Sequence, residues 1–183
     1  MDWSQVSLKE AYRQEKPAVS FELFPPKTAE GRESLFAHLP ELAACRPAYI
    51  TCTYGAGGTS RDRTLNLLRE VRQGYPRIPV GAHLACLGAS RAYLERFLAE
   101  AVSLGVDRIV ALRGDPPRNG VEFQPAPDGF RHAVELVRLI RETHPDLGVI
   151  VAGYPETHPE APSMAKDIDY LKEKVDAGAD AVI

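Results

Sequence analysis

The amino-acid sequence predicts an α/β fold, because short apolar strands alternate along the chain with amphipathic helices. The segments between the expected strands carry apolar residues at a spacing of three or four. Strands connected through helices pair in parallel, since a parallel pair needs a long crossover connection. Two arrangements fit this pattern: a doubly wound open sheet, and a (β/α)8 TIM barrel, which typically has about 250 residues.

Six segments are expected to be strands. Each is rich in apolar and β-branched residues and ends at a glycine, a proline or a polar residue. In chain order they are residues 18–24, 48–53, 80–85, 108–112, 148–152 and 180–183.

The expected helices lie before the first strand and between successive strands. Each carries an apolar stripe, and several begin after a serine or end at a glycine, which are typical capping residues. They cover residues 6–15, 31–44, 61–73, 90–104, 130–143 and 163–178.

The chain therefore contains five β/α units and the start of a sixth strand, which ends at Ile183. An apolar strand that stops there would leave an unpaired edge, which promotes aggregation. We interpret residues 1–183 as one domain, an incomplete TIM barrel truncated at its C-terminus. A non-catalytic half-barrel that needs a partner chain is the alternative.

The composition of the chain argues against two classes of binding partner. The net charge of -3 argues against nucleic acid or anionic membrane as a partner, because both select basic patches. The sequence has no bilayer-spanning apolar run and no signal-peptide pattern at its N-terminus. The three cysteines form no CxxC motif, and Cys52 and Cys86 lie in or beside apolar strands. Inert buried thiols in a reducing cytoplasm are the expectation.

Polar residues follow five successive strands. In a parallel α/β fold the carboxyl ends of all strands lie at one edge, so these groups should converge on a site. They are Glu22, Thr53 with Tyr54, His83, Arg113 to Asp115, and Tyr154 with His158.

Each group also has a simpler interpretation. Glu22 could be a solvated strand residue, although inside a barrel a desolvated carboxyl can act as a general acid. His83 could be structural, and Arg113 could pair with Asp115 in a loop. A minor alternative is a metal-dependent barrel hydrolase, whose ligands would be Glu22, His83, Asp115 and His158. The sequence has no HxH pair and no tight acidic cluster, so we expect no metal.

Six motifs resemble the 5,10-methylenetetrahydrofolate reductase family, in order and at compatible spacing, over nearly the whole chain after residue 17. The motifs are Ser-Phe-Glu-Leu-Phe-Pro-Pro at 20–26, Thr-Tyr-Gly-Ala at 53–56, Ala-His-Leu at 82–84, Ala-Leu-Arg-Gly-Asp-Pro-Pro at 111–117, Tyr-Pro-Glu-Thr-His-Pro-Glu-Ala at 154–161 and Lys-Val-Asp-Ala-Gly-Ala at 174–179.

The resemblance implies a cytoplasmic flavoprotein oxidoreductase with a (β/α)8 barrel and non-covalent FAD. Such an enzyme reduces methylenetetrahydrofolate to methyltetrahydrofolate with NADH or NADPH, in the one-carbon metabolism that feeds methionine synthesis. We also expect a homo-oligomer. The family continues past the position of Ile183 with glutamines and an arginine that contact nicotinamide and folate.

The resemblance also implies roles for individual residues. Glu22 matches the general acid that protonates folate N10, and Asp115 matches the catalytic aspartate beside the flavin ring. Arg113 and Lys174 would face the FAD pyrophosphate, and Thr53 would also lie near the nicotinamide. The positions that correspond to the flavin site are Thr53, Tyr54, Ala56, His83, Arg113, Gly114, Asp115, Ala126, Tyr154, His158, Ala161, Asp167 and Lys174.

Overall fold

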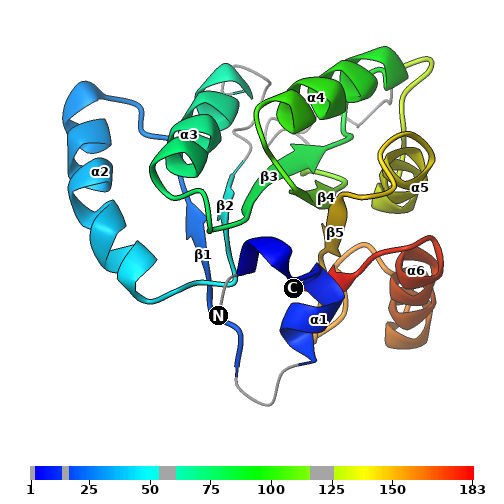
Figure 1. Cartoon of the computed structure of the whole chain (residues 1–183). Coiled ribbons are helices and arrows are strands. Elements are labelled where there is room, and N and C mark those ends of the chain that lie inside the picture. The colour runs from blue at the N-terminus through cyan, green and yellow to red at the C-terminus, as the bar shows by residue number, and fades with distance from the viewer. Residues whose placement is uncertain (1–2, 14–16, 54–60, 116–125) are drawn as a thin grey trace. The chain divides into compact units, whose positions relative to one another are not determined.

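The computed structural model describes residues 3–13, 17–53, 61–115 and 126–183, and it contains a six-stranded sheet (Figure 1). The strands follow one another in sequence order from β1 to β6. Their bounds are β1 Ser20–Leu23, β2 Tyr49–Cys52, β3 Val80–Ala85, β4 Arg108–Leu112, β5 Gly148–Val151 and β6 Ala181–Val182.

The sheet order decides between the two predicted arrangements. In β1 and β2 the register runs in parallel from Ser20 opposite Tyr49, and in β5 and β6 from Ile150 opposite Ala181. A doubly wound sheet reverses its strand order at a switch point, whereas here the order never reverses. The prediction of a parallel α/β fold is confirmed, with six strands in the order of a (β/α) barrel within the part of the chain that is described.

The helices lie close to where the sequence predicts them. Their bounds are α1 Leu8–Tyr12, α2 Ala29–Ala44, α3 Arg61–Gly74, α4 Arg91–Ser103, α5 Ala133–Thr143 and α6 Met164–Asp176, after a short 3-10 helix, Trp3–Gln5.

Capping explains where the helix starts differ from the prediction. In α1 the Ser7 hydroxyl accepts a hydrogen bond from the Glu10 backbone and the Glu10 carboxylate accepts one from Ser7, which confirms Ser7 as the predicted N-cap and starts the helix at Leu8. Helix α2 starts two residues early because Thr28 caps it. Helix α5 starts at Ala133, three residues late, because the Glu135 carboxylate accepts from the backbone of His132.

The chain divides into two compact units. The first comprises residues 1–83 with 99–109, and the second comprises residues 84–98 with 110–183. Strands β3 and β4 and helix α4 each contribute residues to both units.

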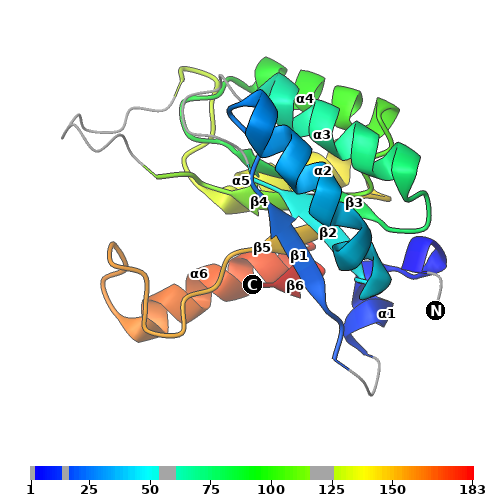
Figure 2. The ribbon, with the colours of Figure 1, turned by 90° about the vertical axis from the view of Figure 1, so that its left-hand side faces the viewer.

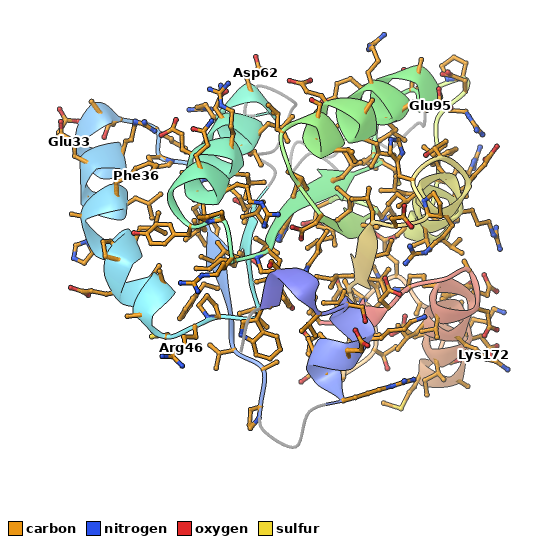
Figure 3. The ribbon with its side chains drawn as sticks, in the orientation of Figure 1. Glu33, Phe36, Arg46, Asp62, Glu95 and Lys172 are labelled. Carbon is orange, nitrogen blue, oxygen red and sulfur yellow. The ribbon has the colours of Figure 1, made fainter. Side chains whose placement is uncertain are left out.

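In the first unit, α2 and α3 run side by side (Figure 2) and are linked by an ion pair between Arg32 and Glu70. The apolar stripe of α3 is fully buried, as predicted, at Leu65, Leu68 and Val71. Polar residues such as Glu33 on α2 and Asp62 on α3 point outward into solvent (Figure 3).

A buried arginine ties the N-terminal segment to this unit. Arg108 is only 4% exposed and lies over the ring of Tyr49, 5.1 Å from its centroid. Its Nη2 donates to the Val6 carbonyl at 3.3 Å, and the Tyr12 and Tyr49 hydroxyls share a hydrogen bond nearby. Burial raises the pKa of the adjacent Asp107 carboxyl and lowers that of the Arg108 guanidinium, despite their mutual attraction.

The second unit contains an arginine that joins three elements. Arg141 on α5 donates to the carbonyls of Gly178, Pro145 and Leu147 and to the Asp180 carboxylate. Asp180 also accepts from the backbone of Val149 at the start of β5. All three nitrogens of the Arg141 guanidinium thus have acceptors, and such a partly buried network stabilises the packing of these elements.

Helix α6 departs from the prediction of an inward apolar stripe. It has no buried residue: Ile168 is 59% exposed, Val175 is 46% exposed and Leu171 is half-buried. By contrast, α5 buries Leu136 and Ile140 fully, as predicted. The same periodic pattern therefore gives a packed helix in one case and a largely exposed helix in the other.

The predicted burial of the cysteine thiols is found at two of the three positions. Cys52 and Cys86 are buried, and burial raises the pKa of the Cys52 thiol to about 12 and that of Cys86 to about 11. Cys45 is exposed at the end of α2. No helix among the described residues combines the length and apolarity needed to cross a membrane.

A thiol reagent should distinguish these environments. At pH 8 we expect the native protein to release one equivalent of chromophore from Ellman's reagent, from Cys45, because only the thiolate reacts and the other two thiols stay protonated and covered. After denaturation all three cysteines should react. Rapid labelling of three thiols in the native protein would contradict the structure.

Candidate active site

The structure places the predicted site residues in two groups, one in each compact unit. The first group, in the first unit, consists of Glu22 on β1, Thr53 directly after β2 and His83 on β3. The second group lines a cavity that is formed wholly by the second unit. Tyr54 and Ala56 lie outside the described residues.

In the first unit, Glu22 and His83 lie close together. Glu22 is opposite Thr51 in the parallel register of β1 and β2, and one Glu22 oxygen is 3.5 Å from His83 Nε2. The same nitrogen is 3.4 Å from the Thr51 hydroxyl. The Glu22 side chain is 44% exposed, so the prediction that it is desolvated is wrong for this structure. Strand β1 is at one end of the strand order within the described part of the chain.

His83 is buried, and burial lowers the pKa of its imidazole to about 4. The ring is therefore neutral at pH 7, and its contact with Glu22 is a long polar contact and not an ion pair. A carboxylate can only accept a hydrogen bond, so a proton on Nε2 is the arrangement that suits this contact. His83 thus offers Glu22 a neutral donor.

Thr53 holds the end of β2 beside the end of β1. Its backbone N–H donates to the Leu23 carbonyl at 2.9 Å, and its own carbonyl accepts from the Thr64 hydroxyl at 2.8 Å. Thr64 is fully buried on α3. The main chain of Thr53 is thereby fixed from both sides, by the end of β1 and by α3.

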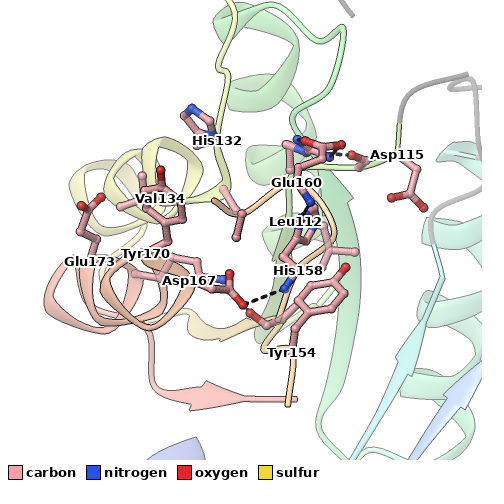
Figure 4. Close-up of a pocket in the computed structure, with 16 residues that line it drawn as sticks. Leu112, Asp115, His132, Val134, Tyr154, His158, Glu160, Asp167, Tyr170 and Glu173 are labelled. Atoms are coloured by element: carbon pink, nitrogen blue, oxygen red, sulfur yellow. Dashed lines mark hydrogen bonds and ion pairs between the residues drawn. The ribbon is translucent and has the colours of Figure 1, made fainter. Parts of the chain in front are cut away.

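The cavity in the second unit has a volume of about 410 Å³. It opens between the end of β4, the loop after β5 and helix α6 (Figure 4). Eight of the predicted cofactor-binding residues line it: Arg113, Gly114, Asp115, Tyr154, His158, Ala161, Asp167 and Lys174. Ala126 does not line it; its carbonyl accepts from Gly129 in a local turn.

Arg113 enters the cavity from the end of β4 and forms a bidentate ion pair with Glu160. Arg113 thus pairs with Glu160 and not with Asp115. The interpretation of a local Arg113–Asp115 salt bridge is therefore wrong. Glu160 is the largest cause of the raised pKa of Arg113. Gly114 adopts φ +90°, which turns the chain sharply between Arg113 and the exposed Asp115.

The loop after β5 is organised by Asp167 and His158. Asp167 Oδ2 accepts from the His158 backbone N–H at 2.9 Å, and His158 Nδ1 accepts from the Glu160 backbone N–H at 3.1 Å (Figure 4). The imidazole also packs edge-on against the Tyr154 ring, with 4.6 Å between centroids. Because Nδ1 accepts, a neutral His158 carries its proton on Nε2.

Lys174 reaches the cavity from α6. Its Nζ donates to the Ala152 carbonyl at 2.6 Å, just after β5. Desolvation lowers the pKa of the ammonium group, and the nearby Asp167 carboxylate opposes that shift. Lys174 is therefore a positioned, half-buried cation, whereas Lys172 two residues earlier is exposed to solvent.

Other lining residues were not predicted from the sequence. They are Leu112, His132, Ala133, Val134, Ala152, Glu160, Tyr170 and Glu173. Helical spacing could have found Tyr170, which lies three residues after Asp167 and four before Lys174 on the same helix. No sequence pattern predicts that His132 and Val134 line the cavity, because their positions depend on the residue at which α5 begins.

The lining combines groups that suit a large, partly anionic ligand. Two cations, Arg113 and Lys174, can neutralise phosphate, and the aromatic rings of Tyr154 and Tyr170 offer flat apolar surface. Among the residues that the structure describes, no cluster of three or more His, Cys, Asp or Glu side chains is placed to hold a metal ion. The described residues therefore give the metal-hydrolase alternative no support.

Comparison with known proteins identifies the family. The family model for methylenetetrahydrofolate reductase matches residues 7–183. A 5,10-methylenetetrahydrofolate reductase of Escherichia coli is 39% identical over 168 residues, covering 90% of this chain and 53% of the relative. Methylenetetrahydrofolate reductase (NADH) 1 of Zea mays is 38% identical over 178 residues, covering 92% of this chain and 30% of the relative. The chain thus spans about a third to a half of the length of these relatives.

Solved structures support the fold. An aldolase superposes with a TM-score of 0.59 at 15% identity, covering 94% of this chain and 70% of that chain. A 2,3-dimethylmalate lyase gives a TM-score of 0.62 at 14% identity, covering 96% and 61%. At such low identity these likenesses concern the fold alone. The family match, the 38–39% identities and the sequential parallel sheet agree, and the chain belongs to the methylenetetrahydrofolate reductase family.

Proposed function

We propose that the chain carries the flavin site and the proton donor of an enzyme that reduces 5,10-methylenetetrahydrofolate to 5-methyltetrahydrofolate with NADH or NADPH. The observation that carries the proposal is the cavity of the second unit. Eight residues assigned to FAD by their place in family motifs line it together, although they come from a strand end, a loop and a helix.

The chemistry of the cavity fits part of a flavin dinucleotide. Arg113 and Lys174 would bind the pyrophosphate, since both are positioned cations with donors suited to phosphate oxygens. Asp115 would lie toward the reacting ring, where its negative charge disfavours extra electron density and favours hydride donation. When bound, FAD would accept a hydride from the nicotinamide and pass it to the folate.

Glu22 is the proposed general acid. The bridging ring of the folate opens only when N10 receives a proton, and Glu22 is an accessible carboxyl at a strand end. The buried neutral His83 would hold one Glu22 oxygen and orient the group. Thr53, Tyr54 and Ala56 are proposed as further flavin-binding residues, as the family motifs imply. The reaction places the protein in one-carbon metabolism and methionine synthesis, in the cytoplasm, and we expect a homo-oligomer.

Purified protein should bind FAD and show the absorption bands of a flavoprotein. Substituting Lys174→Met should weaken FAD binding by about 10- to 100-fold, the value of one charge-assisted hydrogen bond to phosphate. Lys172→Met is the matched control, because Lys172 has the same charge on the same helix but is exposed to solvent.

Titration of the apoprotein with FAD, followed by quenching of flavin fluorescence, measures both dissociation constants. The proposal fails if the wild-type protein neither retains nor takes up FAD. The assignment of Lys174 fails if its substitution has the same effect as that of Lys172.

A further inference from the structure

The anion-binding arginine of the cavity already has an anionic partner. Arg113 Nη2 donates to one Glu160 oxygen at 2.9 Å, and Nη1 donates to the other. The Arg113 side chain is 25% exposed, whereas that of Glu160 is 55% exposed. Glu160 thus covers the forked face of the guanidinium, which is the face that would bind two phosphate oxygens.

Glu160 is held in this place by a chain of hydrogen bonds. Asp167, at the first turn of α6, fixes the His158 backbone, and the His158 ring fixes the Glu160 backbone. These hydrogen bonds therefore fix the loop that carries the Glu160 carboxylate (Figure 4). An exposed ion pair without such support is worth little, because ordering two long side chains costs entropy.

The charges of the residues that line the cavity also favour competition for Arg113. Four carboxylates, Asp115, Glu160, Asp167 and Glu173, line the cavity beside the two cations Arg113 and Lys174. Glu160 itself carries a full charge at neutral pH, since Arg113 lowers its pKa. A phosphate-bearing ligand that approaches Arg113 therefore meets a carboxylate in the place that its own oxygens need.

We propose that Glu160 is an internal competitor for the phosphate-binding face of Arg113, which a phosphate-bearing ligand must displace. The identity of that ligand as FAD rests on the proposed function, but the competition does not. Removing the Glu160 charge should free Arg113 and tighten the binding of phosphate compounds. Because Glu160 lies on a loop and is exposed, the displaced carboxylate can turn into solvent.

The test compares the binding of two probes, FAD and inorganic pyrophosphate, to the wild-type protein and to Glu160→Gln and Glu160→Ala. Both variants should bind both probes about three to ten times more tightly than the wild type. Glu156→Gln is the matched control, because Glu156 lies in the same loop, is exposed and does not line the cavity. It should leave both dissociation constants within about twofold, since a distant surface charge is screened.

The two probes separate the competition from the proposed function. If FAD binds but neither Glu160 variant binds more tightly than Glu156→Gln, the competition is wrong and the flavin assignment stands. If FAD does not bind but the Glu160 variants tighten pyrophosphate binding, the flavin assignment is wrong and the competition stands. If neither probe binds any of the proteins, both proposals are overturned.

Discussion

Substituting Glu22→Gln should slow the reduction of methylenetetrahydrofolate by about 10²- to 10⁴-fold, the usual contribution of a general acid. Glutamine keeps the shape of the side chain and can still make the long polar contact with His83, but it has no acidic proton to give to N10. The exposed position of Glu22 at the end of β1 suggests little cost to folding. The loss should therefore fall on catalysis.

Rapid-mixing experiments on the FAD-loaded protein can assign that loss to one step. Consumption of NADH or NADPH needs no proton from Glu22 and should keep its rate, whereas the step that consumes folate should slow. Glu33→Gln, which makes the same change on the outer surface of α2, should alter neither step. An unchanged folate step in the Glu22 variant would remove this residue from the mechanism.

Substituting Arg141→Met should lower the free energy of unfolding by about 3 kcal/mol, the usual range for breaking a partly buried charged network. The guanidinium serves four acceptors, among them the Asp180 carboxylate, whose side chain is only 14% exposed. Methionine replaces the apolar stem and none of the donors. Three carbonyls and one carboxylate would lose a partner at once.

Urea unfolding followed by circular dichroism measures this difference. Arg138→Met is the control: it makes the same change on α5, at a position exposed to solvent, and should stay within about 0.5 kcal/mol of the wild type. If the two variants have equal stability, Arg141 does not hold α5 to the start of β5 and the end of α6 in solution.

The sequence predicts the order of elements well because each depends on local chemistry. Apolar runs locate β1 to β6 within two residues, and serine or glycine residues mark several helix ends, such as those of α4 and α6. The choice of topology could not come from these local signals. It depends on which strands pair, and the sequential order of the sheet appears only in three dimensions.

The family motifs indicated residues that the structure brings together around one cavity, but they did not indicate the partners of those residues. Family motifs pointed to Arg113, Tyr154 and Lys174, and the cavity contains all three. The sequence could not show that Arg113 pairs with Glu160, 47 residues away, in place of Asp115. The partner of Arg113 depends on the turn at Gly114 and on the path of the loop that carries Glu160. Neither can be predicted from the local sequence pattern. For the same reason the pattern could not reveal that α6 lacks a packed face or that Glu22 is open to solvent.

The glycine between Arg113 and Asp115 has a consequence for how charge is distributed. At φ +90° it adopts a backbone conformation that other residues rarely adopt, and a Cβ atom there would lie 3.0 Å from Leu87 and 3.1 Å from Ala85. Arg113 and Asp115 lie two residues apart in sequence, yet the guanidinium pairs with Glu160, 47 residues further along the chain. The residue with the smallest side chain in the motif therefore sets the backbone turn on which the placement of its two charged neighbours depends.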